Sequence, residues 1–217
     1  VKAKSIMVEP EHDEQFLSLN GNSYRGQLRF LVEKNHIYAV NTVNMDDYLR
    51  GTLGAEMPAN WELEALKAQA VASRSYALYR IRHPRKSAYD VDKDIMDQVY
   101  GGTEAETART ERAIQETANW YLTPKHVPQP KSPLLTFYHS RCGGYTETAE
   151  SVWNGIAPSR STKRVACPYC QRHPSHWKTQ LFIADFLKNL GLHSPSQIFS
   201  ASKNPSGRIA YLEIGDE

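Results

Sequence analysis

Apolar and polar positions alternate along the first 43 residues, which is the two-residue period of a β-strand. Residues 15–19 and 27–32 carry this alternation, and residues 37–40 form a further apolar stretch. Asn20-Gly21 follows the first stretch and is a dipeptide that forms tight hairpin turns. The pattern predicts an N-terminal part built of antiparallel β elements.

After residue 43, the spacing of apolar residues changes to that of an α-helix. Asn44 with Asp47 three positions later indicates a capped helix start. Helices are predicted over residues 44–53, 60–82 and 103–121, capped by Asn44, Asn60 and Thr103. Further along the chain, we predict a strand at 134–138, a short helix near Trp153, a helix over 179–190 and a strand at 209–214.

Strands and helices are grouped along the chain rather than alternating, which favours the α+β class. The length allows one compact domain or two small lobes, and we expect a single domain over residues 1–217. It would consist of a β-rich part (1–43), a helical part (44–123) and a mixed part (124–217) that holds the cysteines.

The composition is that of a folded protein without a strong charge bias. Apolar residues make up 40% of the 217 residues, enough to bury a core, so wholesale disorder is excluded. Lys and Arg total 26 against 24 for Asp and Glu, which does not favour a dedicated binder of nucleic acid or membrane surfaces. No apolar run reaches the roughly 20 residues of a membrane-spanning helix. No leader pattern opens the sequence, so we expect a cytoplasmic protein or the mature part of an exported one.

Glu56 differs from most acidic residues of the chain because its neighbours are uncharged. Gly54-Ala55 precede it and Met57-Pro58 follow it, on the predicted connection between two helices. Burial in such a setting favours the neutral acid and suits a carboxyl group to general acid catalysis, whereas a nearby helix N-terminus favours the ionised form. An ordinary surface or capping glutamate is the alternative.

The long predicted helix carries two polar pairs. Lys67 and Arg74 are seven residues apart and share a face, and Gln69 with Ser73 makes a second, adjacent pair at i,i+4 spacing. The helix is also rich in alanine, which lets another segment or a ligand approach closely. A solvated helix face is the alternative for Lys67 and Arg74.

The stretches around these residues resemble the signature of the stage II sporulation protein D family, SpoIID/LytB. The resemblance begins with residues 54–58 and 64–77 and continues in the family's order through residues 97–102, 137–140, 143–147, 150–153 and 206–208. It covers most of the chain from Arg29 onward. One departure is Ala72-Ser73-Arg74-Ser75, where the family pattern has Ala-Ala-Arg-Thr.

The resemblance implies a lytic transglycosylase that cuts the MurNAc–GlcNAc glycan strands of peptidoglycan. It implies an exported protein that acts in the periplasm or cell-wall space. It also implies that Glu56 is the catalytic acid and that Lys67 and Arg74 belong to a glycan-binding cleft. The LytB branch is described as an enhancer of a cell-wall amidase, so a non-catalytic glycan-binding enhancer is the alternative function.

One carboxyl group is sufficient for this reaction, whereas ordinary glycosidases use two. Glu56 would protonate the glycosidic oxygen. As carboxylate it would then take the proton of the sugar's own 6-hydroxyl, which closes a 1,6-anhydro ring.

Several polar residues are candidates for holding the glycan. Lys67 or Arg74 can pair with the lactyl carboxylate of muramic acid. Tyr138 and Ser140 lie near Gly143-Gly144, where a backbone can approach a sugar closely, although a strand end and a turn explain them equally well. We predict five substrate-binding residues: Lys67, Gln69, Arg74, Tyr138 and Ser140.

Three cysteines and one histidine have the spacing of a structural zinc site. His139-x-x-Cys142 and Cys167-x-x-Cys170 are two chelating pairs separated by a loop. Together they supply four ligands and leave no position for a catalytic water, so we predict one structural zinc ion.

Other interpretations of the cysteines stay open. A disulfide with one cysteine left over is the first, and an exported protein would tolerate it. A thiol oxidoreductase is the second, because Cys167-Pro168-Tyr169-Cys170 is a redox-type tetrapeptide. His173 and His176 are substitute candidates for a zinc ligand.

Overall fold

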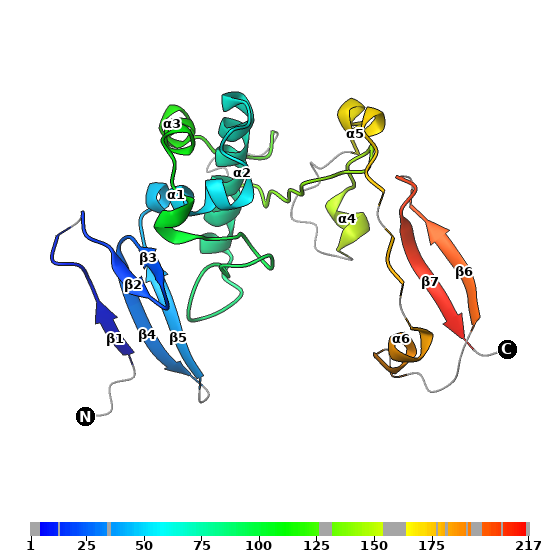
Figure 1. Ribbon diagram of the computed structural model, residues 1–217, viewed down its shortest axis with the longest axis horizontal. Helices are drawn as coiled ribbons and strands as arrows, with labels where there is room; N and C mark the ends of the chain where they lie inside the picture. Colours follow the sequence, from blue (N-terminus) through cyan, green and yellow to red (C-terminus); the bar gives the residue numbers. More distant parts are fainter. Residues whose placement is uncertain are drawn as a thin grey trace. The chain divides into compact units, whose positions relative to one another are not determined.

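The chain forms two compact units, Val1–Tyr138 and His139–Glu217 (Figure 1). The computed structural model describes residues 5–12, 14–33, 36–125, 132–153, 164–176, 178–180, 182–189, 191, 197–204 and 206–215. Antiparallel strands and helices occupy separate stretches of the chain, so the predicted α+β class is confirmed. That both units serve one catalytic domain stays a prediction.

A three-stranded antiparallel sheet opens the first unit. Its strand order is β1 (Ser5–Val8), β4 (Gln27–Glu33) and β5 (His36–Thr42). Strands β4 and β5 pair along their whole length, from Gln27 opposite Thr42 to Glu33 opposite His36. The alternation of the sequence therefore predicts these strands correctly.

A separate hairpin joins β2 (Leu17–Leu19) and β3 (Asn22–Tyr24). Its turn is Asn20-Gly21, whose φ angles are +52° and +83°. Two consecutive positive φ angles are the geometry that an Asn-Gly turn favours, which confirms the predicted turn.

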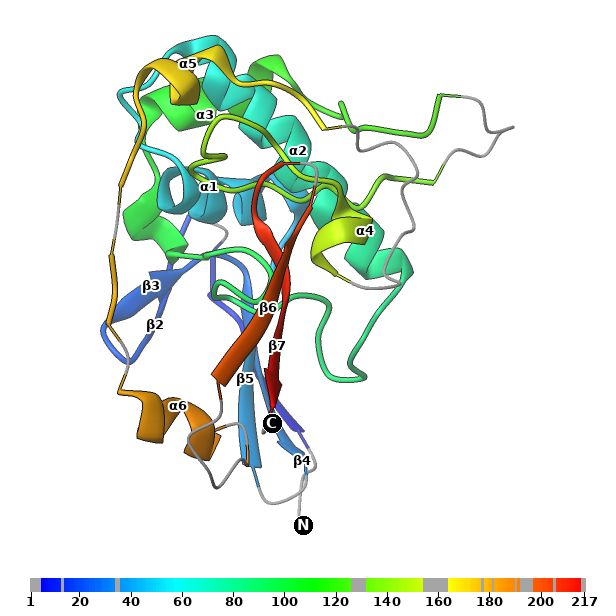
Figure 2. The same cartoon turned by 90° about the vertical axis from the view of Figure 1, so that its right-hand side faces the viewer.

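The helices of the first unit are α1 (Met45–Glu56), α2 (Leu63–Arg82) and α3 (Ala108–Glu116), with a 3₁₀ turn at Gly102–Ala105. In Figures 1 and 2 they gather beyond one end of β4 and β5. Their contact forms a buried core of Leu49, Leu53, Leu66, Ala70, Ala113 and Ile114. Each fully buried leucine contributes about 1.5–3 kcal/mol, so this core holds the three helices together.

The predicted helix starts were right for one helix and wrong for two. Asn44 caps α1 as predicted, with its Oδ1 accepting the Asp47 amide at 2.9 Å. Helix α2 begins at Leu63 rather than near Asn60, because residues 58–61 form a turn in which the Trp61 amide donates to the Pro58 carbonyl.

The predicted start of α3 at Thr103 is also corrected. Thr107 is the N-cap and forms the capping box with Thr110. Thr103 lies in the preceding 3₁₀ turn, and the Glu106 carboxylate that would have completed its box is bound by Arg25 at 2.7 and 2.9 Å. The ion pair with a distant residue therefore overrides the local capping signal.

Residues 134–138 run extended but belong to no sheet within the described part of the chain, which corrects the predicted strand. Their hydrogen bonds go elsewhere. The Thr136 hydroxyl donates to the Ala72 carbonyl of α2 at 2.7 Å, and the Leu134 amide donates to the Leu122 carbonyl at 2.8 Å. The segment is thereby fixed along α2, which brings Tyr138 to the site described below.

The described residues of the second unit form three short helices and a β-hairpin. They are α4 (Ala149–Val152), α5 (Pro168–Arg172), α6 (Ile183–Asn189), β6 (Gln197–Lys203) and β7 (Ile209–Gly215). The helix near Trp153 and the terminal strand are confirmed, and α6 is shorter than the predicted helix. Among the described helices of both units, none is long and apolar enough to cross a membrane.

Candidate active site

Glu56 is the last residue of α1 and is half-buried. Its Oε1 accepts the Val99 backbone amide at 2.5 Å, a contact between residues 43 positions apart. The segment that carries Val99 is tied to the same helix, because the Gly101 amide donates to the Gly51 carbonyl at 2.8 Å. Gly51 lets the Tyr100 ring lie where a Cβ atom would stand. The end of α1 and the 98–101 segment thus jointly fix the position of the Glu56 carboxylate.

The Tyr138 phenol interacts with this carboxylate. Burial, together with the negative charge of Glu56, raises the pKa of Tyr138 to about 12. Hydrogen bonds from Gln98 and Ser73 act in the opposite direction. Tyr138 is therefore a neutral phenol at physiological pH.

Gln98 lies behind Tyr138 and is completely buried. Its Nε2 donates to the Tyr138 oxygen at 2.9 Å, and its Oε1 accepts the Tyr48 hydroxyl at 2.9 Å. Tyr48 belongs to α1, as Glu56 does, and burial raises its pKa well above the usual range. A continuous polar network therefore runs from the middle of α1 to its end.

Helix α2 contributes Gln69 and Ser73 to this network. Both are buried, and Gln69 Nε2 donates to Ser73 Oγ at 3.1 Å. Ser73 in turn interacts with Tyr138. Of the predicted substrate-binding residues, Gln69 and Tyr138 are thus the two that the structure brings together with Glu56.

Lys67 and Arg74 lie on the other side of α2 and contact α3. At 100° per residue they are about 20° apart around the helix, whereas Gln69 is about 160° from Lys67, so the two polar pairs are opposite rather than adjacent. Lys67 pairs with Glu64 and Glu116 at 2.7 and 2.5 Å. Their predicted contact with a substrate carboxylate stays a prediction.

Arg74 is only 2% exposed, and its guanidinium group binds backbone carbonyls at the end of α3. Nη1 donates to the Thr117 carbonyl at 2.9 Å and to the Trp120 carbonyl at 3.1 Å, and Nη2 lies 3.5 Å from the Ile114 carbonyl. Burial lowers the pKa of Arg74, and the nearby Asp46 partly offsets this. The last carbonyls of a helix have no partner in the helical ladder, and Arg74 adds hydrogen bonds there to those of the Thr117 and Trp120 amides.

Replacing Arg74 by alanine should therefore lower stability strongly. A hydrogen bond to a charged group contributes about 1.5–3 kcal/mol, and the substitution removes those to the Thr117 and Trp120 carbonyls, so we expect a loss of roughly 2–4 kcal/mol in the free energy of unfolding. Lys67→Ala is the matched control, because Lys67 is on the same face but pairs with exposed carboxylates, and its unfolding midpoint should move little. Urea unfolding of both variants measures this. An Arg74→Ala protein that is fully stable but turns over glycan poorly would instead support the cleft role.

Ser140 and His139 are exposed and begin the second unit. Glu56 belongs to the first unit, so the predicted contact of Ser140 with substrate stays a prediction.

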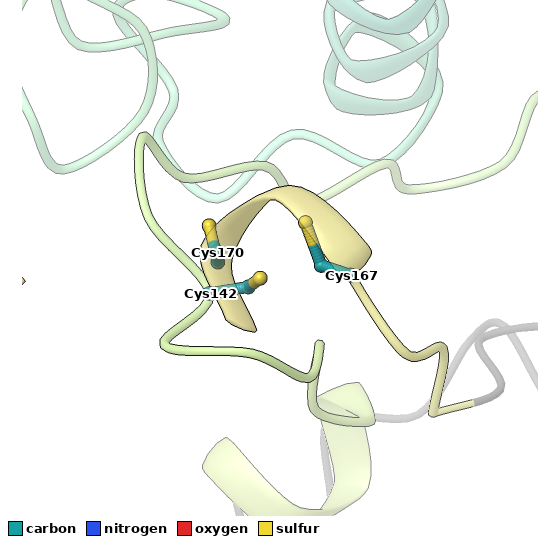
Figure 3. Close-up of side chains that lie close together, drawn as sticks. All are labelled: Cys142, Cys167 and Cys170. Carbon is teal, nitrogen blue, oxygen red and sulfur yellow. The ribbon is translucent and has the colours of Figure 1, made fainter. Parts of the chain in front are cut away.

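The three cysteines lie together in the second unit. Cys167 and Cys170 are at the start and in the middle of α5, and Cys142 is on the neighbouring loop (Figure 3). Their sulfur atoms all lie within 4.8 Å of one another, and His139 is not part of this group. Thiolates bound to one tetrahedral zinc at about 2.3 Å are about 3.8 Å apart, so the three sulfurs fit a soft metal ion.

The local chain geometry explains why the cysteines meet. Gly143 and Gly144 have φ angles of +61° and +108°, which reverse the chain after Cys142. The Cys167 amide then donates to the Gly144 carbonyl at 2.8 Å. Burial raises the pKa of Cys142, and a hydrogen bond with the Cys142 backbone lowers the pKa of Cys170. All three thiols are free, without a disulfide.

The redox interpretation of the tetrapeptide has little support in this geometry. Such a motif is expected after a buried strand and at the start of a helix. Here α5 has five residues, and Val165 just before it is 57% exposed.

The site includes groups that the sequence analysis did not identify. Gln98, Tyr48 and the Val99 amide have no assigned role there, although residues 97–102 were part of the resemblance. The adjacent Asp97 shows why this segment is rigid: its side chain is 1% exposed, ion-paired with Arg80 and Arg85, and accepts the Asp92 amide at 2.8 Å.

The first unit is an α+β fold that holds one half-buried carboxylate at the end of a helix, next to buried phenol and amide groups. This arrangement is a candidate acid–base site. Residues 33–123 of the chain match the family model described as stage II sporulation protein, SpoIID. The chain belongs to the SpoIID family.

Three curated relatives illustrate this similarity. An uncharacterized protein of Brachyspira hyodysenteriae is 34% identical over 203 residues, which cover 91% of this chain and 53% of the relative. The amidase enhancer of Bacillus subtilis is 34% identical, covering 74% of this chain and 22% of the enhancer. Stage II sporulation protein D of B. subtilis is 31% identical, covering 71% of this chain and 48% of that protein. The chain thus spans about half the length of two of these relatives and about a fifth of the third.

Proposed function

We propose that this chain cleaves the glycan strands of peptidoglycan as a lytic transglycosylase, with Glu56 as general acid and base. The observation that carries the proposal is the fixed carboxylate of Glu56, bound by the Val99 amide and facing the neutral Tyr138 phenol. Family membership and relatives named for sporulation and amidase enhancement support a role at the cell wall. Peptidoglycan lies outside the cytoplasmic membrane, so we propose that the protein acts in the periplasm or cell-wall space.

The hydrogen bond from Val99 suits a residue that alternates between two protonation states. A carboxylic acid protonated on Oε2 keeps Oε1 as an acceptor, and the carboxylate keeps it as well. The amide bond can therefore persist while Oε2 gives its proton to the glycosidic oxygen and later takes one from the 6-hydroxyl of the sugar. Because the nucleophile belongs to the substrate, no second carboxylate is needed.

Gln69 and Tyr138 are the substrate contacts that the network around Glu56 supports best. Both present hydrogen-bonding groups on the side of α2 and of the 134–138 segment that faces the carboxylate. Sugar hydroxyls can exchange hydrogen bonds with the Gln69 amide, and the Tyr138 ring can pack against a sugar ring.

The alternative is a glycan-binding protein that activates a cell-wall amidase without cutting glycan itself. One of the relatives, the B. subtilis amidase enhancer, favours it by name. The purified protein should be incubated with peptidoglycan alone and with an added amidase. Soluble glycan fragments formed by the protein alone support the enzyme, whereas fragments released only through amidase cleavage support the enhancer.

We further propose that the second unit binds one structural zinc ion through Cys142, Cys167 and Cys170. The supporting observation is the mutual approach of the three sulfurs within 4.8 Å. Three thiolates and one further ligand would close a tetrahedral site, so the ion would order the loop around α5 and take no part in the proposed chemistry. His139, His173 and His176 are candidates for the fourth ligand.

A further inference from the structure

Gln98 connects two tyrosines at the centre of the network and has no contact with solvent. It is 0% exposed, and both ends of its amide are used: Oε1 by the Tyr48 hydroxyl and Nε2 by the Tyr138 oxygen, each at 2.9 Å. Tyr48 and Glu56 are eight residues apart on α1, about 12 Å along the axis. Gln98 therefore links the middle of this helix to the phenol that faces its last residue.

The orientation of the Gln98 amide follows from its two hydrogen bonds. The Tyr48 hydroxyl donates to Oε1, an atom that can only accept. The NH₂ group is thereby turned toward Tyr138.

The direction of the Tyr138 hydroxyl follows in the same way. Its oxygen has two lone pairs and one proton. One lone pair accepts Gln98 Nε2, and the second faces Ser73, whose own oxygen accepts from Gln69. The single proton of Tyr138 is then left for the remaining neighbour, the Glu56 carboxylate.

We propose that Gln98 is a positioning residue, which directs the Tyr138 proton toward Glu56 and so fixes the carboxylate in the geometry needed for proton transfer. The inference rests on the proposed function, because a fixed donor matters to turnover only if Glu56 transfers protons. With the Val99 amide on Oε1 and the Tyr138 hydroxyl as a second donor, the carboxylate cannot rotate freely. Displacement of a reacting group by about 1 Å can reduce the rate about 100-fold.

The variant Gln98→Leu tests the proposal, because leucine has a similar volume and removes both hydrogen bonds. Gln115→Leu is the matched control, on an exposed part of α3. Release of anhydro-glycan from purified peptidoglycan is measured over a range of substrate concentrations. We expect kcat of Gln98→Leu to fall about 10- to 100-fold with KM changed less than about twofold, and Gln115→Leu to equal the unmodified protein. A fall in kcat/KM that comes from KM alone would overturn the proposal.

A double-mutant cycle separates positioning from a loss of packing. If Gln98 acts through Tyr138, adding Gln98→Leu to Tyr138→Phe should lower kcat little further, because the directed proton is already absent. Fully multiplicative losses would show that Gln98 acts independently of Tyr138 and would overturn the proposal. If Gln98→Leu does not fold, Tyr48→Phe replaces it in the same cycle, since it removes only the hydroxyl that orients the amide.

Failure of this inference and failure of the proposed function give different results. Gln98 variants with normal kcat, beside an inactive Glu56→Gln, would refute the role of Gln98 and leave the acid–base assignment intact. Full activity of Glu56→Gln would refute the proposed function itself.

Discussion

Glu56→Gln is expected to abolish glycan cleavage while the fold is preserved. General acid and general base catalysis contribute about 10²–10⁴-fold each, so losing both should reduce turnover by several orders of magnitude. The substitution should cause little strain, because the amide oxygen can replace Oε1 as acceptor of the Val99 amide. Turnover on purified peptidoglycan and the thermal unfolding midpoint are the two measurements.

Glu62→Gln is the matched control. This substitution makes the same chemical change at the N-cap of α2, where Glu62 is exposed and its side chain makes no capping hydrogen bond. It should retain full turnover. An active Glu56→Gln protein would exclude Glu56 as the acid and base, whatever the behaviour of the control.

The products of the unmodified protein test the second half of the reaction. Attack by the sugar's own 6-hydroxyl leaves 1,6-anhydro ends on muramic acid, which mass spectrometry distinguishes from reducing ends by the mass of one water. Reducing ends would mean hydrolysis and would require a second carboxylate in the site.

Removal of the proposed zinc ion is expected to destabilise the second unit severely. Structural zinc contributes about 10–16 kcal/mol of folding free energy in zinc-finger peptides at neutral pH, because the unfolded chain has no preformed site. A chelator should therefore abolish ordered structure around α5, seen as lost protection of its amides from hydrogen exchange. Elemental analysis should find one zinc per chain before chelation and none after it.

The three cysteines distinguish a metal from a disulfide when they are replaced one at a time by serine. A shared zinc ion requires every thiolate, so Cys142→Ser, Cys167→Ser and Cys170→Ser should each lose zinc and lower thermal stability to a similar extent. A disulfide needs two of them, so one of the three variants would be neutral. No bound metal, together with a mass two hydrogens below the reduced chain, would replace the zinc site by a disulfide.

The local signals of the sequence determined much of the first unit. Asn44 caps α1, Asn20-Gly21 forms the hairpin turn, and the alternation of residues 27–32 forms β4. These features depend on residues close together in the chain, where backbone preferences and short-range hydrogen bonds act. The sequence likewise singled out Glu56 and the close approach of Cys167 and Cys170, since both depend on short spacings.

The orientation of the long helix was decided by tertiary contacts. Spacing alone showed that Lys67 and Arg74 share a face, but not which neighbour that face meets. The structure turns it toward α3, where Arg74 satisfies carbonyls more than 40 residues away, and turns Gln69 toward the site of Glu56. A helix is free to rotate about its axis until its partners fix it, so sequence periodicity cannot choose between the two sides.

The groups that hold the Glu56 carboxylate likewise could not be predicted from the sequence. Val99 donates a backbone amide, which every residue except proline possesses, and Gln98 gives no pattern by which a buried amide could be recognised. Their roles arise because the 97–101 segment folds back onto α1, which places Val99 beside Glu56 at a sequence separation of 43. The sequence thus singled out Glu56 as a candidate acid, on the connection after the predicted helix. Only the tertiary structure decided that Glu56 ends α1 and which groups hold its carboxylate, because hydrogen-bond partners are set by position in space.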